Sequence, residues 1–594
     1  MPGQGETSFA QLEDRERTRQ LAGLGRGQGK RRVKGQRGLD SGQRTADKRD
    51  YCAFKSRPFD YSTIRPFDYS TIRLFDYFLI SNSIISFTVK LGFDNEKYLK
   101  EQSEEIRRRA GKYGRLYLEF GGKLINDFHA ARCLPGYDPN VKLRLLQTLK
   151  DQAEVILCLY SGDIERKKMR ADFGISYADD ALKLIDDLRS LGLTVRGVVI
   201  TRFQEQAAVK LFRAKLERRG VRVYYHYKTE GYPSDVDTIV SDRGYGKNEY
   251  VQAEKPIVVV TAPGPGSGKF ATCLTQIYHE YRQGKVAGYS KFESFPVWNL
   301  PLDHPLNIAY EAATIDLRDQ NMIDPYHKAA YGVETVNYNR DVDAFPLLVA
   351  IWQKMTQGEC PYKSPTDMGV NRIGFGIVDD AVVREASKQE VIRRFLRYQC
   401  AFAEGACPRS MVERAKELMD SLGLRTEDRI VVEAARAAAA EAQIRGKGKA
   451  GGTIVSGAAV ELADGRLVTG RNSDEMHAAA AMVMNAVKTL SGIPAQIPLI
   501  SPNIIRSIAH MKQDILKVGY TSLNLDEALI GLAISATTNP AAQIAMERLN
   551  ELRGCEVHMT HIVTPGDEAG LRRLGCRFTS DPYYATNALF NGER

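Results

Sequence analysis

Between residues 116 and 282, short apolar runs alternate with longer stretches of helical periodicity, and this alternation constrains the fold most strongly. Strand-like runs lie at 116–120, 155–159, 195–200, 221–225 and 257–260, with helical stretches at 179–190, 205–219 and 270–282. Alternating strands and helices favour a mainly parallel sheet that is covered on both faces. We therefore predict a Rossmann-like, three-layer α/β domain.

A glycine-rich turn follows the strand-like run at 257–260 and leads into the helical stretch at 270–282. Glycines let the backbone close around an anion, and the free N–H groups and dipole of the following helix favour negative charge there. A lysine in the turn adds a positive charge. We predict that the turn binds phosphate or carboxylate through Gly264, Gly266, Ser267, Gly268 and Lys269.

The turn resembles a Walker A loop, G-x-x-x-x-G-K-[ST], but departs from it at two of the four fixed positions. Gly268 and Lys269 fit the motif, whereas Pro263 replaces the first glycine and Phe270 replaces the hydroxyl residue. That hydroxyl normally holds magnesium, and Thr272 does not stand at its position. The sequence therefore favours anion binding and argues against magnesium coordination by the turn, with a nucleotide as one candidate ligand among several.

A second glycine turn, Gly121-Gly122-Lys123, follows the run at 116–120 and precedes the polar residues Asp127, His129 and Arg132. Ligand sites in α/β proteins commonly form where the carboxyl ends of strands meet, so we include this turn in the predicted binding site. The alternative is that Lys123 is an ordinary turn residue and His129 a hydrogen-bonded structural histidine.

Residues 291–371 are dense in polar side chains interleaved with aromatic ones, an environment in which pKa values shift. From this region we predict His304, His327 and Asp303 as catalytic residues, with His304 or His327 as a general acid or base. Lys363 would add positive charge. The pairs Asp303–His304 and Asp324–His327 have no recognised metal-ligand spacing, so we assign no metal site.

Composition indicates a globular protein with a basic extension. Residues 1–88 carry 16 Lys and Arg against 10 Asp and Glu, and the remainder carries 67 against 63, so most of the net charge of +10 lies in the extension. This distribution argues against nucleic acid as a partner of the folded part. Nine scattered cysteines, no long apolar segment and no signal peptide predict a cytoplasmic protein without a membrane partner.

The extension at 1–88 is rich in Gly, Gln and Arg, and it contains an octapeptide that occurs at 57–64 and again at 65–72. Its composition predicts disorder. Globular patterning begins near Val89, and no methionine follows Met1 before Met169. We therefore expect that translation starts near Val89 and that 1–88 is a start-site artefact; a nucleic-acid-binding tail is the alternative.

Beyond the α/β domain at 89–335, we predict a mainly helical domain at 336–446 and a smaller α+β domain at 447–594. The last begins with a hairpin that turns at Asp464-Gly465. Asn539 and Pro540 are the cap and first residue of a predicted helix in the same domain. Long helices here are compatible with a homo-oligomer.

Six runs of the chain resemble the bacterial family catalogued as domain of unknown function 1846, or uncharacterised protein family 0371. One of them is Trp298-Asn299-Leu300-Pro301-Leu302, and the others lie at 92–98, 119–124, 261–269, 336–341 and 360–371. The resemblance covers residues 89 to about 584. It implies no particular reaction, although some members carry a label as ATP-dependent protease subunits that no motif here supports.

These observations lead to an expected function. We expect an enzyme that binds a phosphorylated or nucleotide-like small molecule at the glycine turn and that performs phosphoryl transfer or hydrolysis. The cofactor stays undetermined, and a small-molecule anion is the expected partner. The alternative is a non-catalytic sensor or assembly protein whose turn binds a regulatory anion.

Overall fold

The predicted alternation of strands and helices forms a seven-stranded sheet in which every neighbouring pair of strands is parallel. The computed structural model describes residues 91–170 and 175–586, so the predicted extension at 1–88 lies outside the described residues. In spatial order the strands are β11 (Gly369–Val370), β8 (Ala287–Phe292), β1 (Arg115–Phe120), β7 (Ile257–Thr261), β2 (Ala153–Tyr160), β5 (Thr194–Thr201) and β6 (Val223–Tyr225). The α/β prediction is confirmed.

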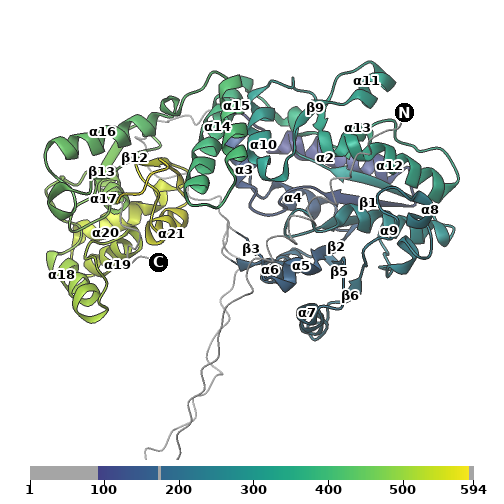
Figure 1. Cartoon of the computed structure of the whole chain (residues 1–594), viewed down its shortest axis with the longest axis horizontal. Helices are drawn as coiled ribbons and strands as arrows, with labels where there is room; N and C mark the ends of the chain where they lie inside the picture. The colour runs from purple at the N-terminus through teal and green to yellow at the C-terminus, as the bar shows by residue number, and fades with distance from the viewer. Residues whose placement is uncertain (1–90, 171–174, 587–594) are drawn as a thin grey trace, which may run out of the picture. The chain divides into compact units, whose positions relative to one another are not determined.

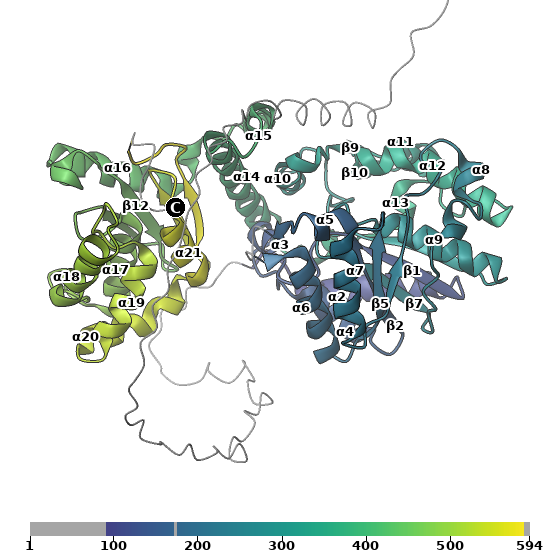
Figure 2. The same cartoon turned by 60° about the horizontal axis from the view of Figure 1, so that its bottom comes forward.

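Helices cover both faces of the sheet. Successive strand residues point to opposite sides, and because both sets are apolar, both faces must be buried. One face, with Leu118 and Val259, packs against α2 (Asn95–Ala110), α4 (Val141–Thr148), α6 (Tyr177–Ser190) and α7 (Ala207–Glu217). The other, with Tyr117 and Val258, packs against α9 (Lys269–Arg282) and α12 (Asn339–Thr356). Figure 2 shows these two helical layers on either side of the strands.

Local capping explains where several helices begin. The Asp94 carboxylate accepts hydrogen bonds from the N–H groups of Glu96 and Lys97 at the start of α2. Ser176 and Asp379 cap α6 and α14 (Asp380–Ala403) in the same manner. The other helices of this region are α3 (Phe128–Cys133), α5 (Ser161–Glu165), α8 (Val236–Ile239), α10 (Pro305–Ala313), α11 (Pro325–Tyr331), α13 (Pro365–Met368) and α15 (Arg409–Ser421).

Short strands accompany the main sheet. β3 (Met169–Arg170) pairs with β4 (Ile175–Ser176), and β9 (Asn321–Ile323) pairs with β10 (Val336–Tyr338), both antiparallel. β11 arises from the region that the sequence predicts as helical and adds an edge strand beside β8. Figure 1 follows the chain through these elements by colour.

A second, smaller sheet forms near the C-terminus, as predicted. Its order is β13 (Leu467–Arg471), β12 (Gly457–Glu461), β14 (Glu556–Met559) and β15 (Arg577–Ser580), and only β14 and β15 pair in parallel. Its helices are α16 (Ile430–Ile444), α17 (Ala478–Ser491), α18 (Pro502–His510), α19 (Leu525–Ala536), α20 (Pro540–Glu547) and α21 (Pro565–Leu574). Among the described residues, no helix combines the length and apolar character that crossing a membrane requires.

Gly470 on β13 allows α17 to approach the sheet closely. A Cβ at this position would lie 2.2 Å from the backbone N of Met482 and 2.7 Å from the carbonyl O of Ala478. Both atoms belong to the helix backbone and cannot move independently of α17. The glycine therefore sets the spacing between this helix and the sheet.

Gly470→Ala should destabilise the C-terminal region by about 1–3 kcal/mol, the usual cost of overpacking a closely packed interior. Urea unfolding followed by circular dichroism measures the change. Gly519→Ala is the matched control, because nothing lies within 4 Å of a Cβ at Gly519. Equal unfolding midpoints for the two variants would contradict the close-packing argument.

Candidate functional site

The connections that leave β1 and β7 run to opposite faces of the sheet, although these strands are neighbours. β1 leads to α3 and α4, and α4 packs on the face that α6 and α7 cover. β7 leads to α9 on the other face. In open α/β sheets, such a divergence opens a crevice beyond the carboxyl ends of the two strands, where ligands bind.

A cavity of about 1650 Å³ lies at this divergence. Both predicted glycine turns line it, together with Glu293, Tyr310 and Glu390. Small-molecule sites usually measure roughly 300–1,000 Å³, so a ligand of that size fills part of the cavity. The structure thus brings the residues predicted for binding into one space.

The first glycine turn, residues 263–269, is held by the neighbouring strand β5. Thr201 at the end of β5 donates a hydrogen bond from Oγ1 to the Ser267 carbonyl at 2.8 Å, and Arg202 Nη2 donates to the Gly266 carbonyl at 2.6 Å. Gly266 and Gly268 adopt positive φ angles of 68° and 82°, which glycine tolerates best. These contacts occupy carbonyl oxygens and leave the amides available.

The amide groups of this turn have no acceptor in the described part of the chain. None of the N–H groups of Gly264, Gly266, Ser267, Gly268 and Lys269 donates a hydrogen bond to another described residue. Ser267 is 4% exposed, and its buried hydroxyl has no hydrogen-bond partner among the described residues. Of the residues that carry these N–H groups, Ser267 is buried, Gly266 is exposed and the others are half-buried. A concentration of N–H groups without protein acceptors at the start of α9 favours an anionic ligand.

The two departures from the Walker A pattern have structural consequences. Phe270 packs its ring edge-on against Tyr289, with 5.5 Å between the ring centroids, instead of offering a hydroxyl. The Thr272 hydroxyl is fully buried and accepts a hydrogen bond from Cys158 Sγ at 3.5 Å, so it does not replace the missing group. The turn therefore lacks the side chain that holds magnesium in the Walker A motif.

The second turn, Gly121-Gly122-Lys123, stands beside the first because β1 pairs with β7. Gly121 passes close to β8: a Cβ there would lie 3.0 Å from the Phe292 carbonyl and 3.9 Å from Glu293 Cγ. Lys142 on α4 supports the turn by donating from Nζ to the Lys123 carbonyl and to Asp127 Oδ2, at 3.3 and 2.8 Å. Glu293, the residue directly after β8, therefore lies beside this turn at the crevice.

A carboxyl group that titrates near neutral pH lies at the end of β8. Lys291 contacts Glu293 at 2.5 Å and also pairs with Asp341 at the start of α12. Burial raises the pKa of Glu293 from 4.5 to about 7, with Lys291 opposing the shift and Asp341 adding to it. Burial alone would lower the pKa of Lys291, but the negative charges of Asp341 and Glu293 have the larger effect and raise it above its ordinary value. The Lys291 ammonium therefore stays charged at the pH where Glu293 exchanges a proton.

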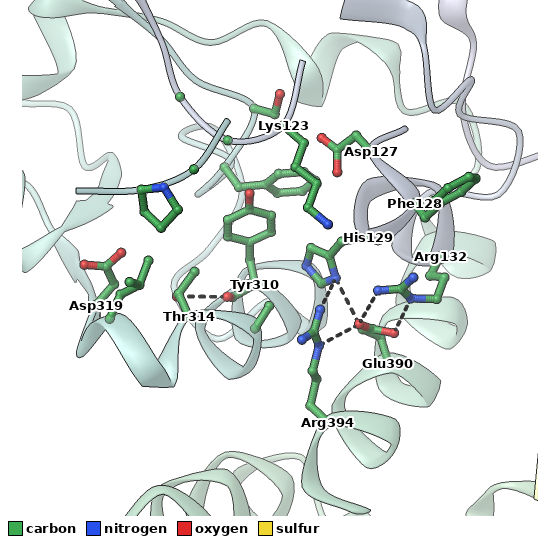
Figure 3. A pocket seen from close by; sticks show the side chains of 18 of the residues that line it. Lys123, Asp127, Phe128, His129, Arg132, Tyr310, Thr314, Asp319, Glu390 and Arg394 are labelled. Carbon is green, nitrogen blue, oxygen red and sulfur yellow. Dashed lines mark hydrogen bonds and ion pairs between the residues drawn. The ribbon is translucent and has the colours of Figure 1, made fainter. Parts of the chain in front are cut away.

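Three arginines and a histidine surround Glu390 at the other side of the cavity, and Figure 3 shows two of the arginines, Arg132 and Arg394, together with His129. The carboxylate is 1% exposed and pairs with Arg132 on α3 and with Arg393 and Arg394 on α14. His129 Nδ1 lies 2.9 Å from Glu390 Oε1. We call Arg132, Arg393, Arg394 and Arg397 the arginine cluster.

His129 is neutral at pH 7, because burial lowers its pKa to about 4 although Glu390 opposes the shift. A carboxylate can only accept a hydrogen bond, so we assign the ring proton to Nδ1. Nε2 is then a lone-pair acceptor, and it is buried without a partner among the described residues. Burial would raise the pKa of Glu390, but the arginines outweigh it and hold the pKa well below its ordinary value.

The residues predicted as catalytic lie outside this cavity. His304 caps α10 by accepting from Leu306 N at 3.1 Å, and its Nε2 pairs with Asp380 at 2.9 Å. His327 on α11 lies with Nδ1 2.9 Å from Ser364 Oγ, and Asp303 is exposed to solvent. None of His304, His327, Asp303 and Lys363 lines the cavity. Their catalytic role stays a prediction that these positions do not favour. Within the described residues, no group of three His, Cys, Asp or Glu side chains is arranged to hold a metal.

Sequence reasoning missed Glu390 and three of the arginines. Glu390, Arg393, Arg394 and Arg397 share one face of α14, since they lie three, four and seven positions apart. On a helix such a pattern is usual for exposed ion pairs, so it pointed to no site. What distinguishes this face is a tertiary contact: α3 brings His129 and Arg132 against it.

Two family models match this chain. "Domain of unknown function DUF1846, N-terminal" matches residues 91–423, and the C-terminal model of the same family matches 427–590. The chain belongs to the DUF1846 family. Among its relatives are UPF0371 proteins of Clostridium tetani (strain Massachusetts / E88) and Clostridium botulinum (strain Langeland / NCTC 10281 / Type F). Each is 55% identical over 502 residues, which is 84% of this chain and 99% of the relative.

The family predicted from six short runs is thereby confirmed. The DUF1846 models meet at residues 423–427, within the region predicted as a helical domain at 336–446, whose boundaries stay predictions. The descriptions of the DUF1846 models and of these relatives name no reaction. A reaction for this DUF1846 member therefore has to be inferred from the geometry and charges of the site.

Glu293→Gln tests the titration near neutral pH. The folded state holds the Glu293 proton more tightly than the unfolded chain does, so the wild type loses stability as the pH rises from 4.5 to about 7. Glu293→Gln has no carboxyl group that titrates at this position, so it lacks this pH-dependent loss of stability. We expect its free energy of unfolding, relative to wild type, to increase over that interval by on the order of 1–3 kcal/mol.

Urea unfolding at several pH values measures this difference. Glu413→Gln on α15, where the side chain of Glu413 is 59% exposed and pairs with Arg409, is the control for loss of a carboxyl. A relative stability of Glu293→Gln that is constant between pH 4.5 and 7 would contradict the raised pKa.

Proposed function

We propose that this protein is an enzyme that binds a phosphorylated or nucleotide-like small molecule and transfers or hydrolyses its phosphoryl group. The observation that carries the proposal is the set of unpartnered amides in the first glycine turn, at the same cavity as Glu293. A phosphate accepts several hydrogen bonds at once and carries the negative charge that a helix N-terminus favours. Lys269 adds a further positive charge at the turn.

Glu293 is the proposed general base. In the proposed step, the oxygen of water or of an acceptor hydroxyl attacks phosphorus while the bond from phosphorus to the leaving oxygen breaks. Glu293 takes the proton of the attacking group and afterwards gives it to the leaving oxygen. A pKa of about 7 suits both transfers, because a base works best when its pKa lies near the working pH.

Lys291 and Asp341 position Glu293 and do not need to touch the substrate. Their ion pair fixes the ammonium beside the Glu293 carboxyl, and Lys291 favours the ionised, basic form of Glu293. Asp341 acts in the opposite sense, so the two partners balance the proton affinity of Glu293. This balance supports acid–base chemistry over a purely structural ion pair.

Lys269→Ala should weaken the binding of phosphorylated ligands by about 1.5–3 kcal/mol, the range for a hydrogen bond to a charged group. A thermal-shift panel of nucleotides, sugar phosphates and carboxylates, with and without magnesium, identifies ligands, and titration calorimetry gives the affinities. Lys285→Ala is the control, because Lys285 is exposed just beyond the far end of α9. If no anion stabilises the wild type more than Lys269→Ala, the binding proposal fails.

Glu293→Gln should keep the affinity for such a ligand and lose most of its turnover, roughly a hundredfold or more, as removal of a general base predicts. Phosphorus NMR of the ligand with full-length protein follows the reaction. Tight binding without turnover in the wild type would instead support a sensor. Full turnover in Glu293→Gln would remove Glu293 from the mechanism.

A further inference from the structure

The arginine cluster concentrates more positive charge than its carboxylate balances. Three of its members pair with the same buried group, Glu390, while Arg397 forms no ion pair with any described residue. Glu556 also attracts Arg132, but it is itself paired with Arg429 and Arg577. Arg132, Arg393 and Arg394 are half-buried, and Arg397 is exposed. Like charges that are partly shielded from water are costly to hold together, so the cluster is suited to receiving an anion.

The pKa values of two members reflect this crowding. Burial and the neighbouring Arg132 lower the pKa of Arg393 to about 9. Partial desolvation and the neighbouring Arg394 also lower the pKa of Arg397, although this residue is exposed to solvent. An anion among these guanidinium groups would relieve the repulsion and would gain charge-assisted hydrogen bonds, which are stronger than neutral ones.

Donors in the cluster remain available to a ligand. Glu390 accepts a hydrogen bond from Arg394 Nε, while Arg394 Nη1 has no hydrogen-bond partner in the described chain. Arg394 Nη2 lies 3.1 Å from His129 Nδ1, which carries the ring proton and therefore does not accept from it. Arg397 likewise makes no hydrogen bond to a described residue. The unpartnered His129 Nε2 beside them is an acceptor for a ligand hydroxyl.

The cluster and the glycine turns face the same cavity. A Cβ at Gly122 would lie 3.9 Å from the hydroxyl of Tyr310, and the ring of Tyr310 lies 4.9 Å from that of His129. Tyr310 also stacks on Phe295 at 4.0 Å, so an aromatic surface connects the turns with the arginines. Figure 3 shows Tyr310, His129 and Arg394 in this succession.

We propose that the arginine cluster is a second phosphate subsite and that the substrate is a small molecule carrying two phosphate groups. One phosphate occupies the first glycine turn, as in the proposed function on which this inference rests, and the other occupies the cluster. The body of the molecule lies along Tyr310, with a hydroxyl donating to His129 Nε2. A sugar bisphosphate or a nucleoside bisphosphate has this chemistry.

Titration calorimetry on the full-length protein tests this with matched probes: fructose 1,6-bisphosphate against fructose 6-phosphate, and adenosine 3′,5′-bisphosphate against adenosine 5′-monophosphate. We expect at least one bisphosphate to bind the wild type roughly tenfold or more tightly than its monophosphate. Arg397→Ala should abolish this advantage and change monophosphate binding by less than about twofold. Arg397 is the position of choice because its loss leaves every ion pair of Glu390 in place.

Arg394→Ala is a second variant, and it should act in the same direction with Glu390 still paired to Arg132 and Arg393. Arg409→Ala is the control for net charge, since Arg409 is 79% exposed on α15 and pairs with Glu413, away from the cavity lining. It should leave both affinities unchanged.

The outcomes separate the two proposals. If no bisphosphate binds the wild type more tightly than its monophosphate, or if Arg397→Ala and Arg394→Ala both keep the advantage, the subsite is refuted while the glycine turn stands on the Lys269→Ala result. If the arginine variants weaken a bisphosphate but Lys269→Ala weakens no ligand, the cluster binds phosphate and the proposed role of the turn fails.

Discussion

The position of β7 between β1 and β2 is the constraint on which the candidate site depends. β7 follows both strands in sequence, yet it inserts between them and sends its connection to the opposite face. The turn after β7 therefore stands next to the turn after β1 with a crevice between them. Had β7 joined an edge of the sheet, the same glycine residues would form an isolated turn on the surface.

The sequence predicts those features that depend on short-range physics. Alternation of apolar runs and helical periodicity is sufficient for a parallel sheet, and the Asp464-Gly465 turn is sufficient for the β12–β13 hairpin. The helix start at Asn539 and Pro540 was predictable for the same reason, and Asn539 caps α20 by accepting from Ala541 N at 3.0 Å. Each of these features is decided by residues close together in the chain.

The chemistry of the site depends on contacts that the chain order conceals. His129 and Glu390 are separated by 261 positions, and Lys291 and Asp341 by 50, so no local pattern indicates that either pair meets. His304 illustrates the opposite error. It stands in a polar region that is typical of active sites, but its ring caps a helix and pairs with Asp380. Burial and pairing, which decide such roles, are properties of the folded molecule.

The attachment of the first glycine turn to β5 has a kinetic consequence. Thr201 and Arg202 hold two consecutive carbonyl groups of the turn, so the backbone of the turn is fixed before a ligand arrives. A preorganised cradle loses little conformational entropy on binding. Exchange of the proposed anionic ligand should then be limited by diffusion and by removal of its hydration water, without a slow opening of the backbone.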